Sequence, residues 1–192
     1  VETNTGKLTA IGPVLPAASL KKAQFGFDFN PVADRIRVVN DQGQNLRLHP
    51  ETGALASVDP DLKYAENDSN FGKKPGIVAA AYTYNQQDST LTTNYAIDKT
   101  NGTLVTQGSK EGITPAVSPN LGLLFSVGKL DLPALQQVSF DISDLSNLSF
   151  IAVSTAAEPA TTLYQLDLET GQHQKLGTLT DGRALAGLAL EP

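Results

Sequence analysis

The sequence predicts an all-β fold, specifically a β-propeller or propeller-like ring built from four-stranded antiparallel repeats. Three observations support this prediction. Residues 25–58 contain four short stretches in which side chains alternate with a period of two, separated by turn residues. A glycine-containing turn that precedes a predicted outer strand recurs along the chain. No stretch keeps a helical period of 3.6 over more than two turns, so we expect little helix.

The first complete repeat lies within residues 25–58. Phenylalanines alternate with small or polar residues in 25–29, so one face of the first strand carries three aromatic rings. Asn30-Pro31 ends that strand, because proline has no backbone donor and restricts the residue before it. The remaining three strands are predicted at 35–39, 45–48 and 54–58. Four short antiparallel strands joined by tight turns are typical of a propeller blade.

The rest of the chain repeats parts of this first repeat. The glycine turn occurs at Gly6, Gly53, Gly102 and Gly171, with spacings of 47, 49 and 69 residues. Two of these spacings are close to the length of a propeller repeat, about 40–50 residues. The longer spacing indicates an insertion or an irregular extra half-repeat before Gly171. Residues 60–76 are predicted as a long connection, and residues 111–135 as a strand with an irregular crossing.

We predict that residues 1–192 form a single domain. Residues 1–14 begin with the last turn of a repeat, and residues 184–190 read like a first strand. We therefore expect the terminal strands 1–14 and 184–190 to meet and complete one repeat, which removes a free sheet edge. If a ring of three or four repeats cannot close, its exposed edge strands could pair between molecules as a homo-oligomer or filament.

Six segments carry a resemblance to a known family. In chain order they are GFDFNPVADRIRVV, GQNLRLHPETGAL, VAAAYTYN, SFDIS, TLYQLDLETG and LAGLALEP. Over nearly the whole chain this order resembles the bacterial domain-of-unknown-function family numbered 4394. The resemblance implies a secreted or surface-exposed repeat domain of propeller-like build, alone or within larger extracellular proteins. It implies no particular biochemical activity.

Composition disfavours several classes of function. The chain has 14 Lys and Arg against 20 Asp and Glu, a net charge of −6, which disfavours nucleic acid as a partner. No apolar run approaches the roughly 20 residues of a membrane helix, so no membrane insertion is expected. Cysteine is absent, and the two histidines, His49 and His173, are predicted on outer strands away from a shared rim. A Ser-His-Asp or Cys-His arrangement is therefore poorly supported.

The densest group of polar residues lies in the segment that best matches the family. Asp28, Asn30, Asp34, Arg35 and Arg37 follow one another within ten positions. Read functionally, they form a ligand site at a rim or at the central channel, where propellers bind ligands. Read structurally, Asp28 or Asp34 pairs with an arginine, and the Asn30-Pro31 pair turns the chain.

Tyr82 and Tyr84 alternate on one predicted strand. Flat aromatic rings are a common surface for sugar binding, so both tyrosines are candidate ligand-binding residues. The alternative is that they pack between neighbouring repeats, as half-buried aromatic residues of strands often do.

Asp28 and Asp141 occupy equivalent positions in the segments GFDFN and SFDIS. If both face one channel, they could act as the two acids of a glycan-cleaving hydrolase or lyase. Such a pair requires carboxyl groups about 5–10 Å apart. This is the catalytic alternative for the chain.

Calcium is a possible ligand of the connection at 60–76. The pattern Asp68-x-Asn70-x-Gly72 resembles the first half of a calcium-binding loop. The bidentate glutamate expected downstream is missing, because Lys73 and Lys74 follow at once. A hydrogen-bonded Asx turn explains the same residues.

Together these observations favour a non-catalytic secreted module. We expect it to act by binding or self-assembly in an extracellular matrix or on a cell surface, with a polysaccharide or another matrix component as partner. No organic cofactor is expected. The alternative is the glycan-cleaving enzyme that uses Asp28 and Asp141.

Overall fold

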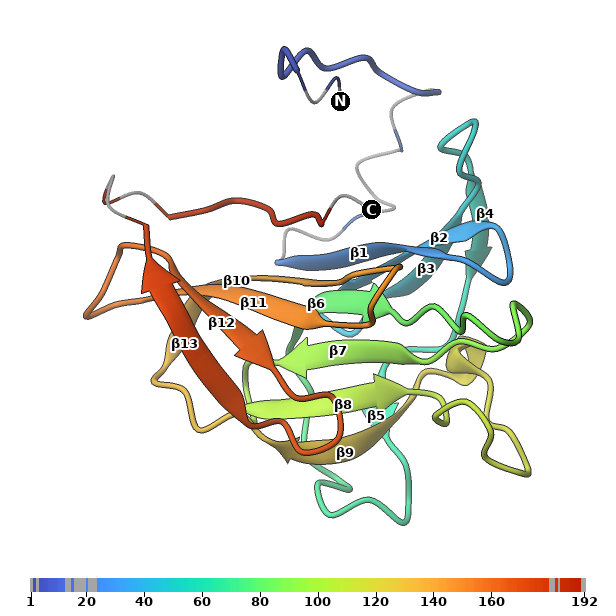
Figure 1. The fold of residues 1–192 in the computed structure, drawn as a ribbon. Helices are drawn as coiled ribbons and strands as arrows, with labels where there is room; N and C mark the ends of the chain where they lie inside the picture. The colour runs from blue at the N-terminus through green and yellow to red at the C-terminus, as the bar shows by residue number, and fades with distance from the viewer. Residues whose placement is uncertain are drawn as a thin grey trace.

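A computed structural model describes residues 2, 4–12, 15, 20, 24–179, 182 and 184–190. Within these residues the protein is all-β, with strands β1–β13 in three sheets and one short 3₁₀ turn, η2 (Pro119–Leu121) (Figure 1). The all-β prediction and the scarcity of helix are confirmed. No helix among the described residues is long and apolar enough to cross a membrane.

The first sheet is an antiparallel meander of four strands. It contains β1 (Phe25–Asn30), β2 (Arg35–Asn40), β3 (Asn45–Leu48) and β4 (Leu55–Val58), in that spatial order. All four strands were predicted, and their bounds agree with the prediction to within one residue. The three phenylalanines of β1 share one face, and the rings of Phe27 and Phe29 meet edge to face at 6.0 Å between centroids.

The second sheet has five strands and contains one departure from the prediction. The meander β6 (Ile77–Tyr82), β7 (Asn94–Asp98), β8 (Thr103–Gln107), β9 (Leu123–Lys129) is antiparallel. A short fifth strand, β5 (Lys63–Tyr64), pairs with β9 in parallel. Part of the predicted connection at 60–76 therefore joins a sheet edge.

The third sheet repeats the design of the first. Its strands are β10 (Leu135–Ile142), β11 (Ser149–Thr155), β12 (Thr162–Leu166) and β13 (His173–Thr178), again in consecutive order. The outermost strands β4 and β13 are largely exposed. Pairing between molecules through such edges stays a prediction.

The glycine turns explain the uneven spacing of the repeats. The N–H of Gly6, Gly53 and Gly171 each donates to the carbonyl four residues earlier, at 2.7–2.8 Å. Gly53 and Gly171 join the third and fourth strands of their four-stranded meanders, whereas Gly102 joins β7 and β8, the second and third strands of the meander β6–β9. Treating Gly102 as equivalent to the others was therefore wrong, because a glycine turn serves either position of a meander.

The second sheet lies between the other two. The first strands β1 and β10 both pack against β6, and the three lie side by side in Figure 1. A Cβ at Gly26 would stand 2.6 Å from backbone atoms of Ala79 and Ala80, so glycine is what lets β1 approach β6 this closely. The described residues do not form a closed ring.

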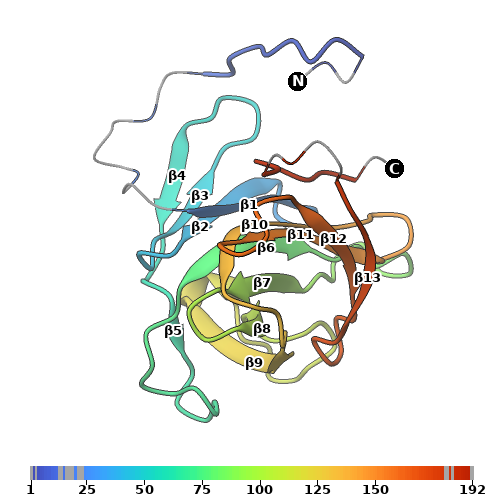
Figure 2. The ribbon, with the colours of Figure 1, turned by 90° about the vertical axis from the view of Figure 1, so that its left-hand side faces the viewer.

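The described segments 4–12 and 184–190 lie on the same side of the sheets, above β1 in Figure 2. Leu190 N–H donates to Asp141, and Leu185 N–H to Thr161, so residues 184–190 run against the third sheet. The described parts of 1–14 and 184–190 contain no strand, and residues 1, 3, 13 and 14 lie outside the described part of the chain. Completion of one repeat by the two ends stays a prediction.

Candidate functional site

The candidate site is a small polar cavity of about 220 Å³ where the first and second sheets meet, here called the junction cavity. Its walls come from the β1–β2 turn, strands β2, β3, β6, β7 and β8, and the segment around η2. The lining side chains are mostly polar and include three arginines. They are Asn30, Val32, Ala33, Arg35, Arg37, Arg47, Tyr82, Thr92, Asn94, Gln107, Ser109, Ser118, Pro119 and Asn120.

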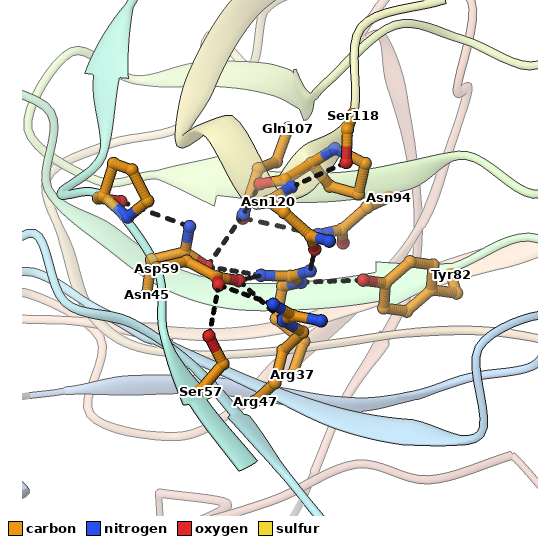
Figure 3. Close-up of polar contacts among 12 residues, drawn as sticks. Arg37, Asn45, Arg47, Ser57, Asp59, Tyr82, Asn94, Gln107, Ser118 and Asn120 are labelled. Atoms are coloured by element: carbon orange, nitrogen blue, oxygen red, sulfur yellow. Dashed lines mark hydrogen bonds and ion pairs between the residues drawn. The ribbon is translucent and has the colours of Figure 1, made fainter.

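Arg37 lies at the centre of this site (Figure 3). It occupies the face of β2 that points to the second sheet, and only 1% of it is exposed. Its Nε–H donates to the Tyr82 hydroxyl at 2.8 Å, and Nη1 donates to Asn45 at 2.5 Å. Nη2 donates to Asn120 at 2.6 Å. A buried guanidinium needs such partners, because an unpaired charge in a protein interior is costly.

Asp59 supplies the negative charge for this arginine and for a second one. Its carboxylate accepts from Arg47 Nε and Nη2, both at 2.8 Å, and from Arg37 Nη1 at 3.2 Å. Ser57 adds a hydroxyl donor at 2.8 Å. Burial by itself raises the pKa of Asp59, but the hydrogen bonds from Arg47, Ser57 and Arg37 outweigh it and hold the pKa below its usual value. Asp59 is therefore ionised at neutral pH.

A layer of side-chain amides completes the polar wall. Gln107 Nε2 donates to Asn45 Oδ1 at 2.9 Å and to the Pro119 carbonyl at 2.7 Å. Asn94 Nδ2 donates to Gln107 Oε1 at 3.3 Å. Asn94 is only 2% exposed, and its Oδ1 atom is buried without a hydrogen-bond partner. Buried acceptors are normally satisfied, so an orphaned one in a residue that lines a cavity needs an explanation.

Local turn chemistry places Asn120 over Arg37. The hydroxyl of Ser118 accepts the Asn120 N–H at the start of η2, and Gly122 ends the turn in the left-handed region with φ 69°. A Cβ at Gly122 would stand 2.5 Å from the Pro60 carbonyl oxygen. Glycine is required there for both reasons, and it keeps the η2 segment close to the loop that carries Asp59.

Four of the predicted ligand-binding residues line the junction cavity. They are Asn30, Arg35, Arg37 and Tyr82. Tyr82 is 2% exposed, so its hydroxyl rather than its ring face takes part in the site, and a flat sugar platform at this residue is not supported. Tyr84 lies elsewhere, where its backbone N–H and carbonyl bond the side chain of Asn147 at 2.9 and 2.6 Å.

The prediction that Asp28 or Asp34 pairs with one of the arginines was wrong about the acid. Neither Asp28 nor Asp34 forms an ion pair with Arg35 or Arg37; Asp59 does so with Arg37. Asp34 instead adopts a positive φ of 46° in the β1–β2 turn, where its backbone carbonyl accepts from Arg35. Asn30 caps the same turn by accepting the N–H groups of Val32 and Ala33.

Asp28 and Asp141 make the same pattern of hydrogen bonds. In each carboxylate, Oδ1 accepts the N–H of the next residue and Oδ2 accepts a backbone N–H from another segment. The donors to Oδ2 are Tyr82 N–H on β6 at 2.6 Å and Leu190 N–H at 2.7 Å. Both aspartates thus join neighbouring segments, and neither lines the junction cavity.

Burial dominates the electrostatics of these two acids. It raises the pKa of Asp28 to about 7, against backbone hydrogen bonds that lower it, and the charge of Asp141 adds to the rise. Burial also raises the pKa of Asp141 above its usual value, again against its backbone hydrogen bonds. Asp28 is therefore a carboxyl group that changes protonation near neutral pH.

The Asp68 loop is held by its own side chains. Asp68 Oδ1 accepts the Asn70 N–H at 2.8 Å, which is the Asx turn considered above. The same carboxylate accepts the backbone N–H and the hydroxyl of Ser126 on β9, at 2.5 and 2.8 Å. Among the described residues no cluster of three or more His, Asp or Glu is placed to hold a metal ion. Calcium binding at Asp68 and Asn70 stays a prediction.

The sequence did not reveal half of the site. Asn45, Asn94, Gln107 and Asn120 were not singled out, because side-chain amides at strand ends and in turns look like ordinary solvated residues. Asp59 was not considered as a partner of the arginines. The available signal was that Asn94 and Gln107 end strands that are otherwise apolar or threonine-rich and buried throughout. That burial becomes visible only when the first sheet covers them.

A model of the family described as "Domain of unknown function (DUF4394)" matches residues 1–189. The chain belongs to the DUF4394 family. The resemblance of the six segments is thereby confirmed over almost the whole length of the chain. No curated protein matches this DUF4394 chain. Its function therefore has to be argued from the junction cavity.

Proposed function

We propose that this DUF4394 chain is a non-catalytic, secreted, polysaccharide-binding module that holds its ligand in the junction cavity. The observation that carries the proposal is the cavity wall itself, in which amide side chains surround a buried arginine held by four hydrogen bonds. Sugars suit such a wall, because their hydroxyls both donate and accept hydrogen bonds, as the amides of this cavity do. Extracellular location follows from the proposal that the ligand is a matrix polysaccharide.

We further propose that the three sheets are consecutive blades of a propeller-like ring. Their first strands β1, β6 and β10 lie next to one another, as the inner strands of blades do. The bond from Leu190 N–H to Asp141 repeats the bond from Tyr82 N–H to Asp28. This parallel supports residues 184–190 as the first strand of a further blade.

The catalytic alternative has one observation in its favour. The pKa of Asp28 is raised to about 7, which is typical of a general acid. Against catalysis, both oxygens of Asp28 and of Asp141 already accept backbone N–H groups. Among the described residues, no carboxylate or histidine lines the junction cavity, so a glycosidic bond held there would have none of them beside it as acid or base.

Binding can be tested with a glycan array followed by titration calorimetry on the best glycan. Tyr82→Phe removes a hydroxyl of the cavity, and we expect binding to weaken about tenfold or more, in line with the loss of one hydrogen bond to a charged group. Tyr84→Phe removes the same group outside the cavity and should leave binding unchanged. Failure of every glycan to bind would overturn the proposal.

The same glycan separates binding from catalysis. We expect it to be recovered at its original length after long incubation with the protein. Shortened products that disappear in Asp28→Asn would instead establish the catalytic alternative.

A further inference from the structure

We infer that the ligand of the junction cavity carries a carboxylate, so that the polysaccharide is an acidic one containing sugar acids. The inference rests on the proposed function and deepens it by naming the class of sugar. Charge, donor count and the orphaned acceptor of the cavity each support it.

The cavity has more positive than negative charge in its surroundings. Arg35, Arg37 and Arg47 all line it, and Asp59 is the one carboxylate that forms ion pairs with any of them among the described residues. Arg35 makes a hydrogen bond to a backbone carbonyl, from Nη1 to Asp34 O at 2.6 Å. A protein of net charge −6 has thus gathered unbalanced cations at one site, which favours an anion there.

Hydrogen-bond donors are also in surplus. Arg37 has five N–H groups, and four are used by its neighbours in the described part of the chain, which leaves one on Nη2. The Tyr82 hydroxyl accepts from Arg37 Nε and has a second side-chain partner in Asn30, so it is not counted among the free donors. Arg35 adds a guanidinium. Planar guanidinium groups match a carboxylate better than any neutral sugar hydroxyl.

Asn94 differs from these donors, because it offers an acceptor to the ligand. Its unpartnered Oδ1 is buried behind the cavity wall, and a small turn of the side chain would bring it to a ligand hydroxyl, which a bare anion lacks. A sugar acid suits this wall, because its carboxylate accepts from the guanidinium donors while its ring hydroxyls can donate to Asn94 once that side chain turns toward them.

The dimensions of the cavity limit the ligand to one ring at a time. Its volume of about 220 Å³ is below the range of about 300–1,000 Å³ that holds drug-sized ligands. Val32, Ala33 and Pro119 give part of the wall an apolar character suited to the C–H groups of a sugar ring. We therefore expect a single sugar acid, terminal or projecting from a chain, to occupy it.

A matched pair of ligands tests the inference. Oligogalacturonate and its carboxyl-reduced form have the same length and differ in charge. Calorimetry should show that the acid binds about tenfold or more tightly than the reduced form, since charged hydrogen bonds contribute about 1.5–3 kcal/mol. Equal binding of both would overturn the sugar-acid inference and leave the proposed function intact. Binding of neither by wild-type protein, together with a negative glycan array, would overturn both.

Charge variants locate the effect. Arg35→Gln should abolish the preference for the acid over the reduced form, whereas Lys63→Gln, which removes an exposed positive charge on β5, should keep it. An equal loss in the two variants would show that the preference is long-range attraction and would overturn the assignment to the cavity. Tighter binding of a sulfated oligosaccharide of equal length would overturn the carboxylate.

Asn94→Leu tests the orphaned acceptor independently of charge. Removing an unsatisfied buried acceptor should leave the thermal midpoint close to wild type, because little bonding is lost. Binding of oligogalacturonate should weaken about tenfold, as one hydrogen bond to the ligand disappears. Unchanged binding in a folded variant would contradict the role given to Asn94.

Discussion

The second sheet meets a neighbour on each face, and the two junctions differ in chemistry. Toward the third sheet the packing is apolar, with Ile97 and Leu104 of the second sheet against Phe140 and Ile151 of the third. Toward the first sheet an apolar strip around Val39 gives way to Arg37, its hydrogen-bonded neighbours and the junction cavity. Two similar meanders thus cover opposite faces of one sheet, one with mainly apolar side chains and the other with an apolar strip and a polar cluster.

This difference separates the junction that stabilises the protein from the junction that we propose binds a ligand. Burying apolar surface stabilises a fold by roughly 25 cal/mol per Å², whereas a buried charged cluster about breaks even against the cost of removing its charges from water. The junction with the third sheet is therefore the stabilising one. The polar junction gains no comparable stability from Arg37 or Asn94, which favours a binding role for it.

The largest expected effect comes from breaking the charge balance of the polar junction. Asp59→Ala leaves Arg37 buried without its counter-ion, and we expect a loss of about 3–5 kcal/mol in the free energy of unfolding. Urea denaturation measures it. The double variant Arg37→Met/Asp59→Leu should recover much of that loss, because the fully buried charge of Arg37 is removed together with its partner, and the remaining Arg47 side chain is 28% exposed to water. A double variant less stable than Asp59→Ala would show that the cluster is a stabilising element after all.

At the apolar junction, loss of side-chain volume should lower the stability of the protein without changing its affinity for a ligand. Leu104→Ala removes a fully buried side chain and should cost about 2–5 kcal/mol in unfolding free energy. Ligand affinity at the junction cavity should stay unchanged below the melting temperature, because Leu104 faces the third sheet. A parallel fall in affinity, measured by calorimetry on the folded variant, would remove the distinction between the two junctions.

A smaller effect concerns pH and lies at the polar junction. Asp28 has a pKa of about 7 in the folded protein against 3.8 as the ordinary value, so the folded state holds a proton that the unfolded state releases. Its contribution is favourable at the acidic end of this window and is lost as pH rises toward 7. At about 1.4 kcal/mol per pKa unit, the loss amounts to a few kcal/mol at most.

The urea midpoint should therefore fall between pH 5 and pH 8. Asp28→Asn should flatten this dependence, leaving the part that comes from Asp141, whose pKa is also raised. Asp59 contributes nothing in this window, because its pKa is lowered and its stabilisation is lost only under more acidic conditions. The same pH dependence in wild type and Asp28→Asn would contradict the buried carboxyl.

The smallest expected effect lies outside both junctions. Asp68→Ala removes three hydrogen bonds that tie the loop to itself and to Ser126, and should cost about 1–2 kcal/mol in unfolding free energy. Calcium should leave the thermal midpoint of the wild type unchanged, because the carboxylate is already occupied. A rise with calcium that is absent in Asp68→Ala would establish the calcium site instead.

The local sequence pattern was enough to predict the strands, but it was not enough to predict which side chains pair across them. The alternation of Phe25–Phe29 and the turn at Asn30-Pro31 predicted β1 to within a residue, because strand period and turn chemistry are properties of neighbours in sequence. Arg37 was found as a candidate, yet its acid was sought in Asp28 or Asp34. The real partner, Asp59, is 22 positions away and reaches Arg37 only after β3 and β4 have folded back.

By itself the sequence determined that this protein is built from short antiparallel meanders, that Asp28 and Asp141 are equivalent, and that the chain belongs with DUF4394. Each of these follows from residues close together or from a repeated motif. Only the tertiary structure decided which face of each strand is buried, and hence that Asn94, Gln107 and Asn120 gather around Arg37. Burial is a relation between sheets, and no stretch of one strand encodes what will cover it.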